Sequence, residues 1–307
     1  MFHDALVPFA ERRIIKMNDK ICFLILHYLA ADTTKNCIES IKKNVIDTDY
    51  CIVVVDNGSN NNSGELLKKR YVDDEKVKVL LLKENLGFAR GNNVGFKYAI
   101  EKEKCNYICM MNNDTLIKQR DFVGKIHEVY KNYKAAVIGP KIILGDGSIN
   151  PIQPELGTIE HYKTTLLLMR ASLIKTYLGI DDIKFSKILR KNKAIVHEKD
   201  TNKIYKDIIL HGCCLIFTPK YINIYNGINS KTYMYREEEL LFLRLKLSNL
   251  SSIYYPDLNI VHLEDVSTNM FMKKQRKKKI FMYKNQIKSL KVLINEMERN
   301  KIYDKKI

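Results

Sequence analysis

Short apolar runs alternate with helical patterns along the first half of the chain. Runs at 21–29, 51–55, 76–82 and 107–111 have the length and composition of buried strands. Helices are predicted between them at about 32–43 and 89–104, and another helix at about 120–133 leads to the apolar run at 135–144. Buried strands joined by crossover helices are typical of parallel sheets. The pattern predicts an α/β fold with a Rossmann-like, mostly parallel sheet flanked by helices.

The second half of the chain departs from this alternation. Residues 150–209 contain two prolines, a mixed helical segment and a polar stretch, which indicates an insertion over one end of the sheet. A strand pattern returns at 208–217, a helical pattern at 237–247, and strand patterns at 251–255 and 258–263. The second half is therefore expected to complete the sheet after an insertion.

The C-terminal segment predicts a basic helical extension. Residues 272–307 hold 13 Lys or Arg and 3 Asp or Glu, so +10 of the net charge of +17 lies there. Apolar residues recur at helical spacing at Ile280, Tyr283, Ile287, Leu290, Ile294 and Met297. Such a helix either packs on the body with a solvated basic face or lies on an anionic membrane surface, where each nearby basic residue adds about 1 kcal/mol.

Composition narrows the class of protein. With 307 residues, 46% of them hydrophobic, the chain can form a globular core, and no apolar window of about 18 residues indicates a membrane span. The N-terminal segment lacks the apolar region of a signal peptide, so we expect a cytoplasmic protein, peripheral on the inner membrane face if the tail binds lipid. Seven cysteines without a CxxC pair are expected to be reduced core residues. Because most of the positive charge is concentrated in one terminal segment, nucleic acid is an unlikely partner.

Polar side chains follow three of the predicted strands. In an open parallel sheet, ligands bind beyond the carboxyl ends of the strands. An Asp at a strand end also occurs by chance as a cap, but several polar groups at one edge favour a ligand site. The residues at this edge are His27 and Tyr28, Asp56 and Asn57, and Asn112, Asn113 and Asp114.

The segment NLGFARGNNVG at 85–95 combines glycines, amides and one arginine at a helix start. It is neither a GxGxxG fingerprint nor a P-loop. Amide donors at a helix start and the guanidinium of Arg90 suit phosphate, although the glycines could instead let the helix pack closely.

Taken in order, seven motifs resemble the inverting family 2 glycosyltransferases of GT-A fold, and most closely their rhamnosyltransferase-like branch. The resemblance covers about 20–270 and implies a nucleotide-sugar-binding half at 20–145 and an acceptor half at 146–270, between an N-terminal extension at 1–19 and the tail at 271–307. The motifs are VVVDNGS (53–59), NLGFARGNNVG (85–95), MMNNDT (110–115), GPKI (139–142), HGCCLIF (211–217), YMYREEELL (233–241) and VHLEDVST (261–268).

The resemblance implies a donor site with a metal. Asp56 matches the family acid that binds the nucleotide base, and Asn85, Arg90 and Asn93 match the loop that lines the nucleotide and its phosphates. Asn112, Asn113 and Asp114 stand at the family's DxD motif, so Asp114 would hold Mg²⁺ or Mn²⁺ against the diphosphate. His262 is a further candidate ligand, or else a core histidine.

The resemblance also implies a general base. Glu237 and Glu238 match the family's ED pair, with Glu238 at the usual catalytic Asp, although glutamates in a first helical turn also favour the helix dipole by themselves. Leu240 stands where the family often has a further Asp. His211 and Gly212 match the acceptor side, and His27 replaces a family amide with a role left open.

These expectations describe an inverting transferase that moves a sugar from a UDP or dTDP sugar to a glycan or lipid-linked acceptor in surface polysaccharide synthesis. A sugar nucleotidyltransferase would share the fold type and the metal, but it needs a glycine-rich basic loop after the first strand, and HYLAADTTK at 27–35 has no glycine. A nucleic-acid-binding protein that uses the basic tail is the other alternative.

Overall fold

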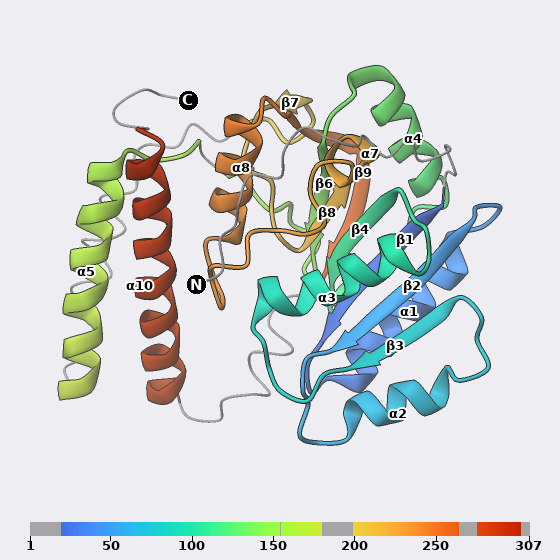
Figure 1. Ribbon diagram of the computed structural model, residues 1–307, viewed down its shortest axis with the longest axis horizontal. Helices are drawn as coiled ribbons and strands as arrows, with labels where there is room; N and C mark the ends of the chain where they lie inside the picture. The colour runs from blue at the N-terminus through green and yellow to red at the C-terminus, as the bar shows by residue number, and fades with distance from the viewer. Residues whose placement is uncertain (1–19, 154, 180–198, 264–274, 302–307) are drawn as a thin grey trace.

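The computed structural model describes residues 20–153, 155–179, 199–263 and 275–301, and Figure 1 shows the arrangement of their helices and strands. The strands are β1 (Ile21–His27), β2 (Tyr50–Asp56), β3 (Val77–Leu81), β4 (Tyr107–Asn112), β5 (Thr115–Leu116), β6 (Val137–Leu144), β7 (Tyr205–Lys206), β8 (Cys214–Phe217) and β9 (Ser252–His262). The helices are α1 (Ala31–Asn44), α2 (Ser63–Arg70), α3 (Phe88–Glu101), α4 (Phe122–Tyr133), α5 (Ile159–Leu178), α7 (Pro219–Ile222), α8 (Glu237–Leu247) and α10 (Gln275–Arg299).

The strands form one mixed sheet in the order β3-β2-β1-β4-β8-β6-β9-β5, with β7 paired to β9. Strands β3, β2, β1 and β4 are parallel, as predicted. β8 runs antiparallel to both β4 and β6, so the second half of the sheet is mixed. The predicted α/β class is confirmed, with parallel pairing concentrated in the first half.

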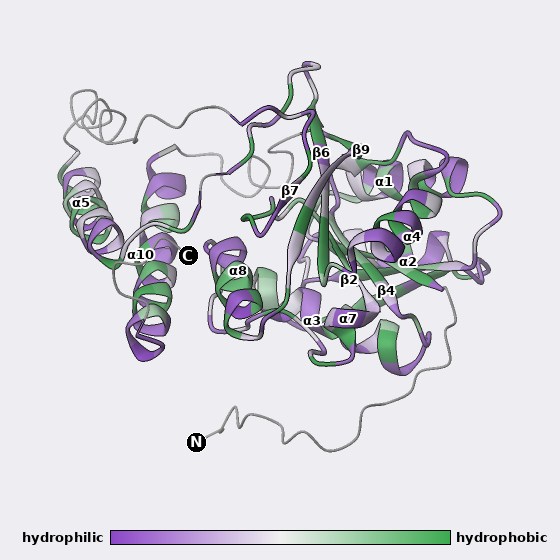
Figure 2. Ribbon diagram, turned by 90° about the horizontal axis from the view of Figure 1, so that it is seen from above, coloured by the Kyte–Doolittle hydropathy of each residue, from purple (hydrophilic) through white to green (hydrophobic). Residues whose placement is uncertain are grey.

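Both faces of the parallel half are covered by helices, which explains why its strands are apolar without alternation. Residues 21–25 of β1 and 52–55 of β2 are fully buried. One core cluster joins the strands to α1 and α4, and a second joins the opposite face to α3 and α8. Figure 2 shows hydrophobic strands between these helices.

Two strand predictions are corrected by the sheet. The run at 208–217 forms a strand only from Cys214, because Gly212 lies in a turn before β8 begins its pairing with β4. The two runs at 251–255 and 258–263 form the single strand β9, in which the register against β6 shifts between Pro140 and Lys141. A bulge accommodates Pro256 there, since proline cannot donate to the ladder.

The helices α5 and α10 lie side by side, and α10 lies between α5 and α8 in Figure 1. The expected place of the insertion over one end of the sheet is thus wrong for α5, which packs on α10. An apolar cluster joins the three helices, and it includes Leu240 and Leu243 of α8 and Leu290, Leu293 and Met297 of α10. The C-terminal part of the predicted stripe is therefore buried against the body.

Candidate active site at the carboxyl ends of the strands

The carboxyl ends of β1, β2 and β4 meet at one edge of the sheet, as the strand pattern predicts. In the parallel register His27 pairs with Asp56, and Leu26 pairs with Asn112. The chain after each strand turns over this edge, so side chains that are far apart in sequence come together there.

The first of two cavities at this edge, here called the strand-end cavity, has a volume of about 340 Å³. Its walls come from the ends of the parallel strands, from the 85–88 loop, from the segment before α8 and from α10. The residues that line it are Leu26, Tyr28, Asn57, Asn85, Gly87, Phe88, Asn112, Asn113, Asp114, Tyr233, Met234, Tyr235, His262, Lys278, Phe281 and Met282.

A hydrogen-bonded group of amides forms one wall of the strand-end cavity. Asn85 Oδ1 accepts from Asn57 Nδ2 at 3.1 Å and from the Tyr233 hydroxyl at 2.9 Å. Gly87 has φ of +83°, and a Cβ on it would lie 2.3 Å from the Tyr233 carbonyl oxygen. Only glycine fits this close approach, so the three segments are held together at a defined spacing.

Asp114 and His262 lie together at the opposite side of this cavity. His262 Nε2 is 3.2 Å from Asp114 Oδ1, and the pairing of Thr115 with His262 brings β5 and β9 together here. Although the atoms are close, Asp114 Oδ1 is buried and accepts no hydrogen bond from the described residues. A buried carboxylate oxygen without a donor, beside an imidazole nitrogen, suits a divalent cation.

These two side chains would supply only part of a metal shell. Within the described ranges there is no group of three or more His, Cys, Asp or Glu side chains that could hold a metal ion. Phosphate oxygens and water would have to complete the coordination.

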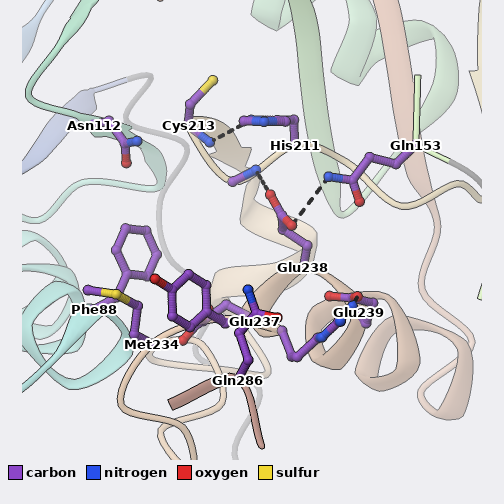
Figure 3. A pocket seen from close by; sticks show the side chains of 13 residues that line it. Phe88, Asn112, Gln153, His211, Cys213, Met234, Glu237, Glu238, Glu239 and Gln286 are labelled. Carbon is purple, nitrogen blue, oxygen red and sulfur yellow. Dashed lines mark hydrogen bonds and ion pairs between the residues drawn. The ribbon is translucent and has the colours of Figure 1, made fainter. Parts of the chain in front are cut away.

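The second cavity, here called the glutamate cavity, has a volume of about 400 Å³ (Figure 3). Glu238 points into it, and its Oε1 accepts from the Gly212 backbone N–H while its Oε2 accepts from Gln153 Nε2 at 3.3 Å. Burial raises the pKa of Glu238 above its usual range. The carboxylate is therefore held in one orientation and is a stronger proton acceptor than an exposed glutamate.

Glu237 also lines the glutamate cavity, and its Oε1 accepts from the Thr232 hydroxyl at 2.9 Å. Burial raises the pKa of Glu237 to about 7. Immediately before it, Tyr235 and Arg236 have φ of 75° and 68°. Two successive left-handed residues without glycine cost on the order of 1 kcal/mol each or more, and they turn the chain so that α8 begins at the cavity.

His211 lines the glutamate cavity and lies near His262, which lines the strand-end cavity. Its ring centroid is 6.0 Å from that of His262, and its Nδ1 accepts from the Cys213 backbone N–H at 3.2 Å. Burial, and then the neighbouring His262, lower the pKa of His211 to about 4. The side chain is consequently neutral near pH 7 and lines the glutamate cavity beside Gly212.

The two cavities share Phe88, Asn112, Met234 and Tyr235 in their linings. A ligand in the strand-end cavity and another in the glutamate cavity would therefore meet at the end of β4. This arrangement suits the reaction of two bound molecules, with Asp114 in the lining of one cavity and Glu238 in the lining of the other.

A comparison with protein families decides what kind of protein has this site. The family model for glycosyl transferase family 2 matches residues 22–193, which are more than half of the chain. The chain belongs to glycosyl transferase family 2. The family named from the seven motifs is thus confirmed.

Relatives of this glycosyltransferase family member agree with that assignment. The chain is 28% identical over 123 residues to glycosyltransferase GlyG of Streptococcus pneumoniae. The aligned region covers 40% of this chain and 39% of GlyG. It is 23% identical over 253 residues to rhamnosyltransferase WbbL of Escherichia coli, over 73% of this chain and 86% of WbbL. The chain thus spans less than half the length of GlyG but most of WbbL.

A solved structure shares the fold. The chain superimposes on S. aureus TarS 1-349 in complex with UDP-GlcNAc with a TM-score of 0.51 and 14% identity, over 87% of this chain and 65% of TarS 1-349. The GT-A type of fold expected from the resemblance is confirmed.

Within this family 2 fold, two predicted nucleotide contacts are corrected. His27 is fully buried, and its ring nitrogens bond to the hydroxyls of Thr34 at 2.7 Å and Ser63 at 2.8 Å. Burial lowers the pKa of His27 to about 4, against an opposing effect of Asp56. Asn93 bonds through both its amide atoms to the backbone of Ile228. Both side chains hold loops in place because their polar atoms are already occupied by protein groups.

Two further predicted residues lie outside the lining of both cavities. Asp56 is buried, and its Oδ1 accepts from the backbone and the hydroxyl of Ser59, while the next residue, Asn57, lines the strand-end cavity. Arg90 is exposed on α3. The predicted phosphate contact of Arg90 and the base contact of Asp56 therefore need a rearrangement or a ligand that extends beyond the cavity.

The strand-end cavity also contains residues that the sequence patterns did not indicate. Tyr233, Met234 and Tyr235 come from the segment before α8, and Phe88 begins α3. The motif YMYREEELL includes these residues of the segment before α8, but the resemblance implies roles only for its glutamates. The remaining unexpected residues are Lys278, Phe281 and Met282 of α10.

Proposed function

We propose that this protein transfers a sugar from a nucleoside diphosphate to a hydroxyl of a glycan or lipid-linked acceptor in surface polysaccharide synthesis. The observation that carries the proposal is the meeting of two cavities at Asn112 and Tyr235, with Asp114 beside one and Glu238 in the other. The donor occupies the strand-end cavity, and the acceptor occupies the glutamate cavity. The name of the rhamnosyltransferase WbbL supports the transfer of a sugar, and the UDP-GlcNAc bound to TarS supports a nucleotide-sugar donor.

The donor is a UDP or dTDP sugar in this proposal. Asn85 and Tyr233 offer an amide and a hydroxyl group to it, and Phe88 and Tyr28 offer apolar surface. A Mg²⁺ or Mn²⁺ ion held by Asp114, with His262 as a second ligand, would stabilise the negative charge of the departing diphosphate. The orphaned Oδ1 of Asp114 supports this choice of ligand.

Glu238 is the general base in this proposal. Its carboxylate takes the proton of the acceptor hydroxyl as the oxygen attacks the anomeric carbon and the bond to the diphosphate breaks. Attack from the face opposite the leaving group inverts the anomeric configuration. The pKa raised by burial and the fixed orientation from Gly212 and Gln153 support this role, and His211 and Gly212 border the acceptor.

A membrane contact through the basic tail is a second part of the proposal. Lys277, Lys288 and Lys291 are exposed on α10, whereas Leu290 and Met297 of the apolar stripe are buried. Any contact with anionic lipid would therefore use the lysines rather than this buried C-terminal part of the stripe. None of the described helices is long and apolar enough to cross a membrane.

The test is a panel of UDP, GDP and dTDP sugars incubated with the purified protein and Mn²⁺. Release of one nucleoside diphosphate, with calorimetric binding of the same nucleotide, is the expected result. The anomeric configuration of the product, measured by NMR, tests inversion. A protein that binds no nucleotide and consumes no donor of the panel would contradict the proposal.

A further inference from the structure

One face of α10 is built into the site rather than turned to solvent or to a membrane. Lys278, Phe281 and Met282 line the strand-end cavity, and Gln286 lines the glutamate cavity. Their spacing of three, four and eight residues places them on one side of a helix. This side differs from the apolar stripe that packs against α5 and α8, so α10 uses two faces for two purposes.

Contacts along α10 fix its position relative to the cavities. Ser289 is buried and its hydroxyl donates to the Met234 carbonyl oxygen at 2.7 Å, which joins the helix to the segment that lines both cavities. Lys231 Nζ lies 2.8 Å from Glu296 Oε1. With the apolar cluster on its other side, α10 is held as a wall of the site.

The charge of this wall is what the donor requires. Lys278 is the only lysine or arginine in the lining of the strand-end cavity within the described ranges, and it shares that lining with Asp114 and His262. Phe281 packs edge-on against Tyr233, with ring centroids 6.5 Å apart, and makes this side of the cavity apolar. An ion pair next to an apolar wall is screened less by water than one on an open surface.

We propose that Lys278 binds the diphosphate of the donor, taking the place expected for Arg90. This inference rests on the proposed function, because it assigns the phosphate contact of that same site. The ammonium group of lysine is a compact positive charge that suits phosphate. It would neutralise the part of the diphosphate's negative charge that a single cation on Asp114 does not compensate. The basic extension would then complete the donor site as well as carry charge on its exposed side.

The experiment compares Lys278→Gln and Lys278→Arg with Lys279→Gln, a matched change at a neighbouring exposed lysine. Binding of UDP, or of the nucleoside diphosphate found in the panel, and of its nucleoside is measured by calorimetry with Mn²⁺. Competition by inorganic pyrophosphate is measured in donor turnover. Thermal unfolding of each variant checks that the fold is retained.

The expected result is a loss of roughly 10- to 100-fold in diphosphate affinity for Lys278→Gln, the size typical of a lost charged hydrogen bond. Nucleoside affinity should be unchanged, pyrophosphate should compete less well, and Lys278→Arg should retain most of the affinity. Lys279→Gln should match the wild type.

Two results would overturn the inference. Diphosphate affinity of Lys278→Gln within about twofold of the wild type would exclude the contact, and an equal loss for the nucleoside would indicate a merely structural role. If the wild type turns over donor while Lys278→Gln is unaffected, only this inference fails. If the wild type binds no nucleotide, the proposed function fails with it.

Discussion

Replacement of Glu238 by glutamine removes the proposed base with little change of shape. In the wild type the two carboxylate oxygens accept from the Gly212 N–H and from Gln153 Nε2. The amide oxygen of Glu238→Gln can keep the bond from Gly212, and its NH₂ group then faces Gln153, which can turn its own amide to present oxygen. We therefore expect a stability change of no more than about 1 kcal/mol, the size of one neutral hydrogen bond.

The expected effect on catalysis is much larger than the effect on stability. A lost general base typically lowers the rate by roughly 10² to 10⁴, which raises the barrier by about 2.7 to 5.4 kcal/mol. Donor affinity should be nearly unchanged because Glu238 lines the glutamate cavity and is absent from the lining of the strand-end cavity. Turnover and donor binding should thus separate in this variant.

The assay is the initial rate of nucleoside diphosphate release with acceptor present, together with the calorimetric dissociation constant of the donor nucleotide. A pH series adds a second signature. Because burial raises the pKa of Glu238, the wild-type rate should fall as the pH is lowered through that pKa, and the variant should lack this limb.

An unchanged turnover number for Glu238→Gln would refute the assignment. The same substitution one residue earlier, Glu237→Gln, is the comparison variant, since Glu237 lies in the same cavity and has a raised pKa as well. A large loss in Glu237→Gln together with normal turnover in Glu238→Gln would move the role of base to Glu237.

Three other predictions test the metal, the pH dependence of stability and the tail. Asp114→Asn should raise the Mn²⁺ concentration needed for half-maximal activity by at least the roughly 10- to 100-fold typical of a lost supporting ligand, and an unchanged metal titration would remove Asp114 from the site. The folded protein holds the Glu237 proton up to about pH 7, whereas an unfolded glutamate releases it near 4.5. The stability of the folded protein should therefore fall as the pH rises between those values. Thermal unfolding should depend less on pH in Glu237→Gln than in the wild type. Equal slopes of unfolding temperature against pH in the two proteins would contradict the raised pKa of Glu237. Replacement of Lys277, Lys288 and Lys291 by Glu should weaken binding to anionic vesicles by about 1 kcal/mol per lysine or more, measured by sedimentation. Donor hydrolysis is the control. Undiminished vesicle binding would exclude this face of α10 as the lipid contact.

The polar groups at the strand ends illustrate how far local pattern reaches. The strand runs placed Asp56, Asn112 and Asp114 at one edge, and the observed register bears this out. The strand pattern does not indicate which of the two polar residues at the end of β2 faces the cavity. Asp56 is the last residue of the strand and turns toward Ser59, whereas Asn57 follows the strand and opens onto the cavity.

The basic helix illustrates the same limit over a longer range. Its apolar stripe is visible in the sequence, but the pattern left open whether the stripe meets protein or lipid. The structure places Leu290 and Met297 against α8 and α5, and it places Lys278 in the lining of the strand-end cavity together with Asn112 of β4 and His262 of β9. Contacts between residues more than a hundred positions apart carry no local periodicity, so the sequence pattern could not indicate them.

The amino-acid pattern is enough to predict the parallel strands, the polar edge, the family and a basic amphipathic helix. The strands and the helix follow from spacing within a single segment, where burial and backbone geometry set the period, and the polar edge follows from the order of the strands and helices along the chain. The packing of the elements is needed to see which side chains line the two cavities, that the cavities meet at the end of β4, and that α10 forms one wall of the site. Those features depend on how separate elements pack, and packing orients a side chain only once its distant neighbours are in place.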